Sequence, residues 1–559
     1  MIGGKVGVTR TNLQSIIQKL RLMPADAFAS SDKPPADRAM PASAASAPAP
    51  ATKAALGGRI RAWVGSPLFV LLLATLAVRI VGIDRPLTGT FATKSAVHAM
   101  VARNWALGRA PYYQPTIDLL TGNERSWHLM EWPAASFVAA MGWKWFGGSL
   151  DAWGRGISIV CSLVSVWLLY RLADRWFGPR AAQGAAFVFA FAPVSIIYGQ
   201  SFLLEASLAT LLLAALVCFD DWLRTRSTVR LIIAAIAVGL AILTKIYMLA
   251  IFLPLAAMLY FDASRRAARS SKSLRRILGE DCVIAAAAFG AVLVPVAAWY
   301  YWVFNVPHTF GPATDYHPLG RGTIHGFPHP LLFTTAYYSR LAIDFATVVL
   351  TPLGVLLAGY GFLDPRFRRQ WPLCAAFGLL LVAFPLKFMV ANYYYLVLLP
   401  ALALAAGLGW QRLLESPNVA GNKTTRRVIL GLVAVSFVVA MRYAIGPAYR
   451  THPEDRGVVA AANLVKMLTQ PEDRVATIHG STIDLLYYCD RPGWAFDADD
   501  VELDSKIRDA VRRGAMLLVV VGLDDLERRP TLSLPLSQRV VLASGDDWRI
   551  YRTVEPVKF

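Results

Sequence analysis

Charged residues are scarce in this sequence. Asp, Glu, Lys and Arg make up 17% of the 559 residues, whereas 56% are hydrophobic and the mean hydropathy is +0.45. Soluble globular domains carry about 25% charged residues, so this balance excludes a soluble protein of this length. The apolar residues come in blocks of helix-spanning length and lack the period-two alternation of a membrane β-barrel.

Cysteine is also rare, with five residues in the chain. Cys161, Cys218, Cys282 and Cys374 fall in apolar blocks, and Cys489 lies near the end of the chain. Their spacing matches neither a disulfide framework nor a zinc site. We therefore expect small buried hydrophobic residues and predict neither a metal nor a cofactor.

Acidic residues are outnumbered by basic ones, 37 against 56, which gives a formal net charge of +19. In a soluble protein this excess would indicate nucleic-acid binding. Here the basic residues lie mostly in short connections between apolar blocks, where positive charge orients membrane helices. We therefore predict the lipid bilayer as a partner and no nucleic acid, and we note that the charge also suits a substrate that carries phosphate.

The chain does contain a long series of apolar segments, which we interpret as about eleven membrane spans. These segments lie near residues 66–83, 155–172, 181–198, 203–222, 229–244, 247–261, 282–304, 339–362, 371–386, 393–410 and 427–446.

The basic residues predict how these spans are oriented. With eleven spans and a cytoplasmic N-terminus, five clusters of arginine and lysine all fall on the cytoplasmic side. The block 134–147 must then lie in the interface, which suits its length and its tryptophans. Because no cleavable signal pattern precedes the first span, we expect a retained anchor after a basic, disordered segment over 1–60.

These features predict a mainly α, polytopic membrane protein whose transmembrane domain covers 61–446. The first outside loop, 84–154, is expected to carry interfacial helices. The tail over 447–559 is no longer apolar, and patterns such as RVATIHG and MLLVVVG predict a small α/β domain on the outer face.

Polar and aromatic residues collect on one side of this topology. The set is Asp84, Lys94, Arg103, Asp118 and Glu131 in the first loop, and Glu205, Lys245, Lys387, Asn392, Tyr393 and Tyr394 at outer ends of spans. Ionisable residues at membrane–water junctions are costly unless they are paired or useful. Their convergence from distant parts of the chain predicts a binding site at that face.

Structural interpretations stand beside the functional one. Lys245 and Lys387 could extend to the headgroups, the run Tyr393–Tyr395 could form an interfacial aromatic belt, and Glu205 could pair with an arginine. Four histidines lie in a Gly- and Pro-rich loop near 305–338, without the spacing of a helical metal pair; they could be ordinary loop residues or a weak metal site. They are His308, His317, His325 and His329.

At this point the sequence resembles a known superfamily over residues of about 60–450. The motifs that carry the resemblance, in chain order, are GIDRPLTG, MVARNW, MEWPAASFVAAMGWKWFGG, GRGISIVCSLVSVWLLYRLADRWFG, FAFAPVSIIYGQSFLLEA, GLAILTKIYMLAIFLPL and NYYYLVLLPALALAAGLG. Together they are similar to the C-type integral-membrane glycosyltransferases, and within these to bacterial relatives of protein O-mannosyltransferases and of the lipid A aminoarabinose transferase.

The resemblance implies a function and a location. Such enzymes take a sugar from a polyprenyl-phosphate carrier, a hydroxyl of a cell-envelope acceptor attacks the anomeric carbon with inversion, and the lipid phosphate leaves. A carboxylate must accept or orient the hydroxyl proton, and cations must stabilise the departing phosphate. A bacterial inner membrane with the site facing the periplasm fits the resemblance.

The carboxylate is where the sequence departs from its relatives. They usually carry an acid on the segment leading into the ARN-like motif, and the equivalent positions here hold Lys94, Ser95 or Val97. Three acids remain nearby. We favour Asp84, after the first span, as the base; Glu131, in a segment resembling Glu-Lys-Pro-Pro, and Asp118 are the alternatives. Asp84 could instead cap a helix or pair with a neighbouring arginine.

The other polar residues are candidates for binding the donor phosphate or the substrate. Lys94, Arg103, Lys245 and Lys387 are candidates for binding the donor phosphate, since lysine and arginine both pair well with phosphate. Glu205, Asn392, Tyr393 and Tyr394 are candidates for binding substrate.

The segment FATKSAVHAMVARNW, 91–105, is predicted to form a surface helix. Its Val97, Met100, Val101 and Trp105 share one face, and we expect that face to lie in the lipid while Lys94 and Arg103 flank it.

Two other function classes stay open. A transporter or flippase for a lipid-linked sugar would be expected to show internal repeats, which the sequence lacks. A non-catalytic protein that binds or assembles lipid-linked glycans is favoured by the missing loop acid.

Overall fold

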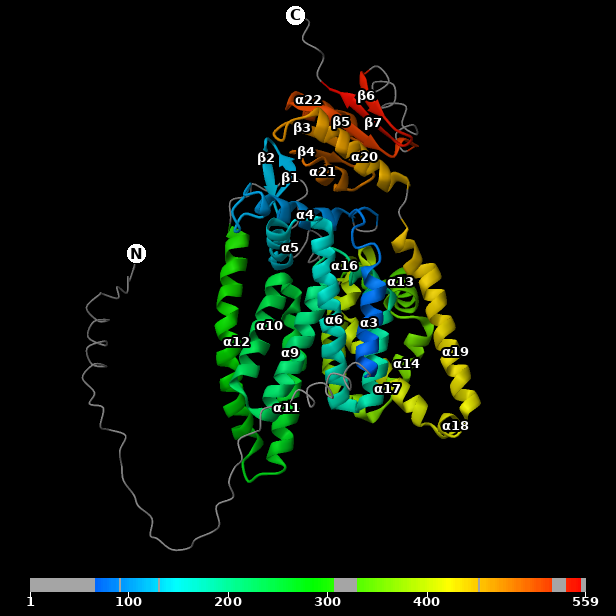
Figure 1. Cartoon of the computed structure of the whole chain (residues 1–559). Helices are drawn as coiled ribbons and strands as arrows, with labels where there is room; N and C mark the ends of the chain where they lie inside the picture. The colour runs from blue at the N-terminus through cyan, green and yellow to red at the C-terminus, as the bar shows by residue number, and fades with distance from the viewer. Residues whose placement is uncertain are drawn as a thin grey trace, which may run out of the picture. The chain divides into compact units, whose positions relative to one another are not determined.

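The computed structural model describes residues 66–89, 92–128, 131–305, 329–450, 453–524 and 539–553 (Figure 1). The predicted N-terminal segment 1–60 and most of the histidine-containing loop therefore lie outside the described residues.

The first part of the chain forms one apolar helix followed by smaller elements. These are α3 (Pro67–Ile80), α4 (Ala92–Ala106), β1 (Thr116–Thr121), β2 (Glu124–Trp127) and α5 (Ala134–Phe146). Ser66 caps α3 by accepting a hydrogen bond from the backbone N–H of Phe69, and Pro67 supplies the fixed φ that suits a first helical turn.

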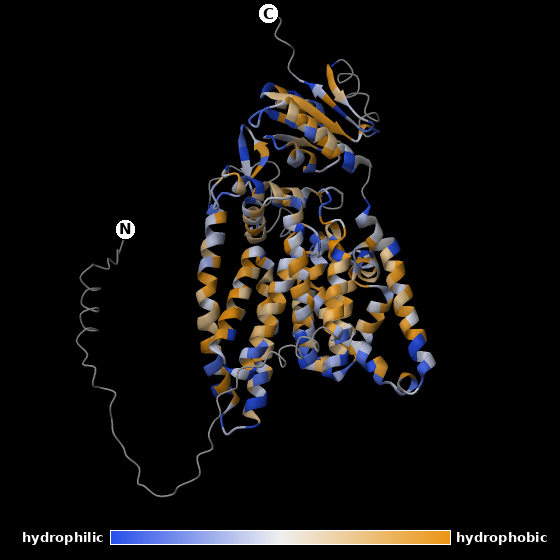
Figure 2. Cartoon of the chain, viewed as in Figure 1, coloured by the Kyte–Doolittle hydropathy of each residue, from blue (hydrophilic) through white to orange (hydrophobic). Residues whose placement is uncertain are grey.

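Long apolar helices make up the middle of the chain. They are α6 (Leu150–Phe177), α7 (Pro179–Phe191), α8 (Pro193–Tyr198), α9 (Glu205–Thr225), α10 (Thr228–Thr244), η1 (Ile246–Ile251), α11 (Phe252–Ala267) and α12 (Leu274–Asn305). Figure 2 shows hydrophobic residues along their middles and hydrophilic residues toward their ends, as expected of helices that cross a bilayer.

Shorter and broken helices follow. They are η3 (Pro330–Phe333), α13 (Thr335–Asp344), η4 (Phe345–Val349), α14 (Pro352–Phe362), η5 (Pro365–Gln370), α15 (Trp371–Ala383), α16 (Pro385–Val390), η6 (Asn392–Val397), α17 (Leu399–Glu415), α18 (Pro417–Ala420), α19 (Lys423–Ala440), η7 (Met441–Ile445) and η8 (Gly446–Tyr449). Proline stands at or near the start of many of them, because it removes the hydrogen bond that would join one helix to the next.

All eleven predicted spans coincide with helical segments, but their number is not confirmed. Within the described residues, four helices are long and apolar enough to cross a membrane: α6, α9, η1 with α11, and α12. The predicted span 339–362 is a helix pair bent by 104°, which could supply a fifth. The chain is a multi-pass membrane protein, and the count of eleven stays a prediction.

Close helix packing depends on glycine at a few positions. A Cβ atom at Gly361 of α14 would overlap the carbonyl of Ala405 in α17, and one at Gly409 of α17 would overlap the carbonyl of Leu357. Small residues let the backbones of membrane helices approach, so these two glycines allow α14 and α17 to pack closely.

The tail contains helices and strands, and part of its sheet comes from the first loop; we keep the name α/β domain for residues 453–553, although a separate domain stays a prediction. Its elements are α20 (Pro453–Leu468), β3 (Arg474–His479), α21 (Asp484–Cys489), β4 (Gly493–Phe496), α22 (Leu503–Arg512), β5 (Ala515–Val521), β6 (Val541–Ser544) and β7 (Trp548–Arg552). The seven-stranded sheet has the order β2-β1-β4-β3-β5-β7-β6. The β1–β2 hairpin therefore extends a sheet whose other five strands lie more than 300 residues later.

The cysteine prediction holds only in part. All five cysteines are free; Cys218 and Cys489 are buried, Cys161 and Cys374 are half-buried, and Cys282 is exposed. The expectation of a buried side chain is wrong for Cys282, because it lies on a face of α12 that other described residues leave uncovered.

Candidate functional site

Glu131 lies at the centre of the candidate site because the backbone beside it is tied to the end of α10. The N–H of Trp132 donates to the carbonyl of Leu243 at 3.2 Å, and α5 begins directly after Pro133. Tyr300 of α12 donates to the neighbouring carbonyl of Ile242 at 2.7 Å. These bonds use carbonyls that the end of α10 would otherwise leave without partners.

Lys245 connects two carboxylates. The α10 helix ends at Thr244, and Lys245 adopts an extended conformation before η1 begins. Its Nζ lies 2.9 Å from Oε1 of Glu131 and 2.8 Å from Oε1 of Glu205, which is the first residue of α9. The side chains of all three are buried, with 4%, 7% and 2% of their surface exposed. A carboxylate is also favoured by the positive end of the α9 dipole.

The α4 helix adds a second lysine and a histidine. Lys94 Nζ lies 3.2 Å from Glu131 Oε1, and His98 Nε2, one turn further along, lies 3.5 Å from Glu131 Oε2. Burial disfavours the charged form of Glu131, but Lys245 and Lys94 outweigh it and hold the pKa of this carboxyl well below its usual range. Glu131 is therefore ionised near neutral pH.

Two histidines beside Glu131 are held neutral. Burial lowers the pKa of His98 to about 3, although Glu131 acts in the opposite direction. Burial, together with Lys94, lowers the pKa of His128 well below its usual value, and the two rings contact edge to face at 5.9 Å. Neither histidine was among the site residues predicted from the sequence; the four-residue spacing from Lys94 to His98 is the signal that places these two residues on one face of α4.

Aromatic residues of η6 complete the surroundings of Lys245. Its Nζ lies 4.7 Å from the ring centroid of Tyr394 and 5.5 Å from that of Tyr393, both cation–π distances. Asn392, the first residue of η6, accepts a hydrogen bond from the hydroxyl of Tyr198 in α8. Tyr393 and Tyr395 are buried, so the alternative of an aromatic belt in the interface does not apply to them.

Lys387 also approaches this group. Its Nζ lies 5.8 Å from the ring centroid of Tyr394 and 5.9 Å from that of Phe384. Burial lowers the pKa of the Lys387 ammonium. No carboxylate of the residues that the structure describes lies within 4 Å of it.

We call the set formed by Lys94, His98, Glu131, Glu205, Lys245, Lys387, Tyr393 and Tyr394 the lysine–glutamate cluster. It holds three ammonium groups and two carboxylates, so one positive charge is left over among the described residues. An anion with a single negative charge would balance the cluster, and burial would strengthen its attraction.

Arg103 and Asp118 lie in a different network. Arg103 Nη2 is 2.6 Å from Asp118 Oδ2, and Arg103 Nε is 3.1 Å from Asp490 Oδ1. Arg125 lies 3.0 Å from the other oxygen of Asp118, whose side chain is fully buried. This network joins the first loop to the α/β domain, and the carboxylate of Asp118 has its partners already.

Asp84 lies in the turn that follows α3, and its side chain is exposed. Among the described residues, Asp84 forms no ion pair with a member of the lysine–glutamate cluster. Arg79, an arginine five residues before it in the sequence, donates instead to the carbonyl of Ala190 and the hydroxyl of Ser195, each at 2.8 Å.

The prediction that one face of α4 lies in the lipid is wrong. Val97, Met100, Val101 and Trp105 are buried in a hydrophobic cluster with Ala139, Phe202 and Leu485, among others. The helix is covered on nearly all sides because α5, α6 and α21 pack around it. Its hydrophobic residues are therefore core residues, and its polar residues at the two ends serve two different networks.

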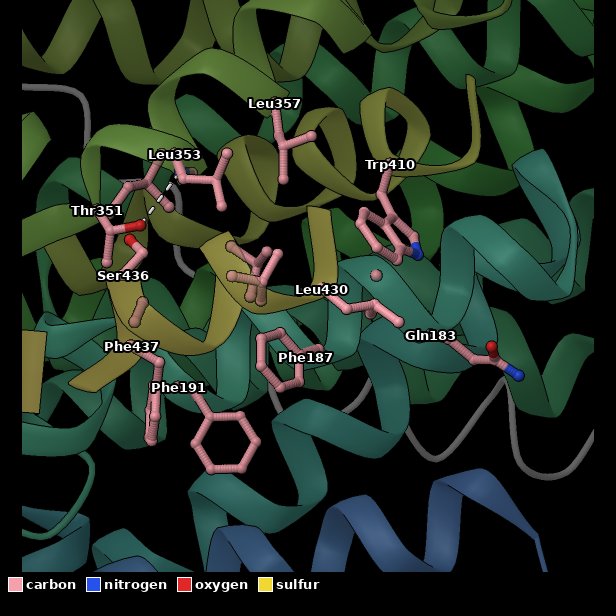
Figure 3. Close-up of a pocket in the computed structure, with 16 residues that line it drawn as sticks. Gln183, Phe187, Phe191, Thr351, Leu353, Leu357, Trp410, Leu430, Ser436 and Phe437 are labelled. Atoms are coloured by element: carbon pink, nitrogen blue, oxygen red, sulfur yellow. Dashed lines mark hydrogen bonds between the residues drawn. The ribbon is translucent and has the colours of Figure 1, made fainter. Parts of the chain in front are cut away.

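An apolar groove lies among α7, α14, α17 and α19. Its volume is about 280 Å³, and Figure 3 shows Phe187 and Phe191 of α7, Leu357 of α14, Trp410 of α17 and Leu430 of α19 around it. One end of the groove is lined by Ala192, the residue before α8, and Tyr198, which donates to Asn392, is the last residue of that six-residue helix.

No group of three or more metal-ligating side chains occurs in the described part of the chain. His308, His317 and His325, of the possible weak metal site, lie outside the described residues; His329 caps η3 by accepting from the N–H of Leu331 at 3.2 Å.

Comparisons with known proteins agree with the helical arrangement. Residues 131–302 match the profile of a family described as dolichyl-phosphate-mannose-protein mannosyltransferase. This segment begins at Glu131 and contains Glu205 and Lys245. No curated protein sequence matches the chain.

Solved structures cover most of the chain. ArnT from Cupriavidus metallidurans bound to undecaprenyl phosphate is similar over 88% of this chain and 98% of its own, with a TM-score of 0.58 and 18% identity. Its apo state is similar over 89% of this chain and 98% of its own, with a TM-score of 0.54 and 18% identity. A third similar structure is the archaeal oligosaccharyltransferase AglB from Archaeoglobus fulgidus, in complex with an inhibitory peptide and a dolichol-phosphate. It is similar over 83% of this chain and 70% of its own, with a TM-score of 0.50 and 14% identity.

Proposed function

We propose, from the premise that this chain has the fold of the C-type integral-membrane glycosyltransferases, that it is a glycosyltransferase using a polyprenyl-phosphate-linked sugar. The acceptor is a hydroxyl group of a cell-envelope glycan, lipid or protein, and the anomeric configuration inverts. The observation that carries this proposal is the lysine–glutamate cluster, because its unbalanced positive charge matches the single charge of a phosphodiester.

Lys387 and Lys94 are the proposed phosphate ligands. Lys387 has no carboxylate partner among the described residues, so phosphate would supply its counter-ion. Lys94 is the more exposed of the two lysines on Glu131, with 18% of its side chain accessible. Lys245 is held on both sides by carboxylates and is proposed to position Glu131 and strengthen the field at the leaving phosphate.

Glu131 is the proposed base. In the unliganded cluster its two lysine partners make it a weak proton acceptor. If Lys94 turns to the donor phosphate, Glu131 loses one of these partners and becomes more basic when the acceptor hydroxyl arrives. This coupling would order the reaction, with donor binding first. Asp84 remains the second candidate, and Asp118 is the least suited because its oxygens already pair with Arg103 and Arg125.

Other parts of the donor have proposed places as well. Asn392, Tyr393 and Tyr394 offer hydrogen-bonding groups and ring faces suited to a sugar, and Glu205 acts through Lys245. The apolar groove beside α7 is proposed to hold the isoprenoid chain, since its lining is apolar and one end approaches η6 through α8 (Figure 3). Along α7 it runs from Ala192 to Gln183, or about 14 Å at 1.5 Å per residue.

The distribution of basic residues supports a proposal for the membrane face on which the cluster lies. We propose that the cluster faces the periplasm of a bacterial inner membrane, with the N-terminus cytoplasmic and the α/β domain on the cluster's side. The basic residues at the opposite helix ends support this orientation through the positive-inside rule.

The test is sugar release from a panel of radiolabelled polyprenyl monophosphate hexoses and pentoses by purified protein in lipid, with cell-envelope extract as acceptor. We expect turnover by the wild type and a loss of about 10²–10⁴-fold in Glu131→Gln, the range for a general base. Glu280→Gln is the matched control, since Glu280 is an exposed carboxylate that also pairs with two cations.

Comparison with Asp84→Asn separates the candidates. Loss in Asp84→Asn with retained turnover in Glu131→Gln would return the role of base to the turn after α3. A second function, non-catalytic binding of lipid-linked glycans, is favoured by one feature: the resemblance implies an acid at the position of Lys94, Ser95 or Val97, and none of these is acidic. It would be supported by donor binding without turnover on any sugar.

A further inference from the structure

A second charged cavity lies at the opposite ends of the spanning helices. Its volume is about 620 Å³, and it is formed by the ends of α6, α9 and α11 together with η5. Six arginines line it: Arg175, Arg224, Arg265, Arg366, Arg368 and Arg369. The 21-residue α9 helix starts in the lysine–glutamate cluster at Glu205 and reaches this cavity at Arg224, a rise of about 30 Å, which is the thickness of the hydrocarbon core.

Four of the six arginines pair with carboxylates, and two do not. Asp220, the one acid in the lining, is shared by Arg224 at 2.8 Å, Arg175 at 3.5 Å and the indole N–H of Trp176 at 3.2 Å. Arg175 also pairs with Asp221 at 2.6 Å, and Arg265 pairs with Asp262 at 3.5 Å. Arg366 forms two hydrogen bonds to Asp364 and lies 3.7 Å from Glu415. Arg368 and Arg369, both exposed, form no ion pair with any carboxylate in the ranges that the structure describes.

Apolar side chains share the lining with the arginines. They are Trp176 of α6, Leu223 of α9, and Met258 and Phe261 of α11. The cavity therefore offers forked cationic donors next to hydrocarbon surface, at the depth where a spanning helix meets the headgroups. Guanidinium groups bind phosphate oxygens in pairs, and basic pockets between transmembrane helices suit anionic headgroups.

We infer that this cavity binds the phosphate headgroup of an anionic membrane lipid in the leaflet opposite the candidate transfer site, with Arg368 and Arg369 as its principal ligands. The acyl chains lie against Met258 and Phe261. This inference does not depend on sugar transfer. The positive-inside rule accounts for basic residues at this end but requires only their charge, not four elements converging on a cavity with apolar side chains in its lining.

The experiment uses the purified full-length chain in detergent, titrated with cardiolipin, phosphatidylglycerol and phosphatidylcholine and followed by native mass spectrometry. We expect the two anionic lipids to bind and phosphatidylcholine to bind far more weakly. The variant R368Q/R369Q should bind the anionic lipids about thirtyfold more weakly, from roughly a fivefold loss per arginine. Added salt should weaken binding in the wild type.

The matched control is R426Q/R427Q, which removes two exposed arginines from the first turns of α19, outside the cavity. It changes net charge equally and should leave lipid binding unchanged. Equal losses in both double variants would overturn the inference in favour of a general charge effect. If R368Q/R369Q does not fold, R368K/R369K keeps the charge but loses the forked geometry, and it should still bind severalfold more weakly than wild type.

Competition with sodium pyrophosphate tests whether the phosphate bound in the cavity belongs to a lipid or to a soluble ligand. A lipid site should keep its lipid when pyrophosphate is added at equal concentration, because the chains also contribute to binding. Displacement of lipid by equimolar pyrophosphate would overturn the lipid assignment and indicate a soluble phosphorylated ligand.

Discussion

At the scale of single residues, Lys245 organises the candidate site. It brings together Glu131, from the loop before α5, and Glu205, from the start of α9, at distances below 3 Å. Buried ion pairs stabilise a fold only weakly, because desolvation costs about as much as the attraction returns. Removing one partner is far more costly, since it leaves another charge buried alone. An arrangement of this kind is better explained by a function that needs buried charge than by stability.

The histidines beside Glu131 predict how stability depends on pH. His98 and His128 have folded pKa values below the value of about 6.5 expected when unfolded, so below pH 6.5 the unfolded chain binds more protons. The free energy of unfolding therefore falls as pH decreases from about 6.5 toward 3, by up to about 1.4 kcal/mol per pH unit for each histidine. The depressed pKa of Glu131 acts in the same direction below about pH 4.3.

Thermal unfolding of the detergent-solubilised protein between pH 7.5 and 5 measures this effect. The melting temperature should fall with decreasing pH, and less steeply in His98→Gln, which cannot take up the proton. A parallel fall in wild type and variant would show that His98 does not contribute.

Sequence reasoning identified most members of the cluster but not their pairing. Lys94, Glu131, Glu205 and Lys245 all stood out as ionisable residues near membrane junctions. Which carboxylate meets which lysine depends on where α10 ends and on the bond from Trp132 to Leu243, and neither is encoded by local periodicity. Arg103 and Asp118 looked equally suited to the site, because Tyr487 and Asp490, which hold Arg103 in the other network, are distant in sequence.

At the scale of helices and strands, packing was harder to predict than the elements themselves. The helix over 91–105 was correctly predicted, but its hydrophobic residues could not show whether protein or lipid covers them. The bent pair α13–η4 and α14 similarly looked like one continuous span, although Pro352 and the extended Leu350 interrupt it.

The α14–α17 contact provides a test at this scale. Gly361→Ala should destabilise the protein by about 1–3 kcal/mol, because the new methyl group overlaps the carbonyl of Ala405 and the helices must separate. Gly359→Ala, two residues away on the same helix, has open space at its Cβ and should be neutral or slightly stabilising. Melting temperatures in detergent compare the two; similar shifts would mean that α14 and α17 do not pack this closely.

At the scale of the whole described molecule, the first loop and the α/β domain are joined by both a sheet and a polar network. The β1 strand pairs with β4 at Leu119 and Gly493, and the hydroxyls of Tyr487 and Tyr488 both donate to Asp151 at 2.6 Å. The α4 helix carries Lys94 in the candidate site and Arg103 in this network. The position of the α/β domain is therefore mechanically connected to the site through one helix.

Asp490→Asn tests that connection. Asp490 pairs with Arg103 at 3.1 Å and Arg109 at 2.8 Å, and it has a left-handed conformation that asparagine also tolerates. Loss of the charge should weaken the junction by about 1–3 kcal/mol and speed amide hydrogen exchange in β1 and β4 by about tenfold or more. Asp509→Asn is the control. Asp509 is an exposed residue of α22 that pairs with Arg513, and its replacement should leave amide hydrogen exchange in β1 unchanged.

The shared sheet also has a consequence for how the protein is made. Arg103 and its partner carbonyl at Tyr487 are 384 residues apart, and at about 5–20 residues per second the ribosome needs roughly 20–80 seconds to supply the second after the first. During that time the hairpin has an unpaired strand edge and α4 carries an arginine without its final partners. A chain that terminates before β4 would keep both, so we expect incomplete chains to aggregate through this strand edge more readily than chains in which β1 has paired with β4.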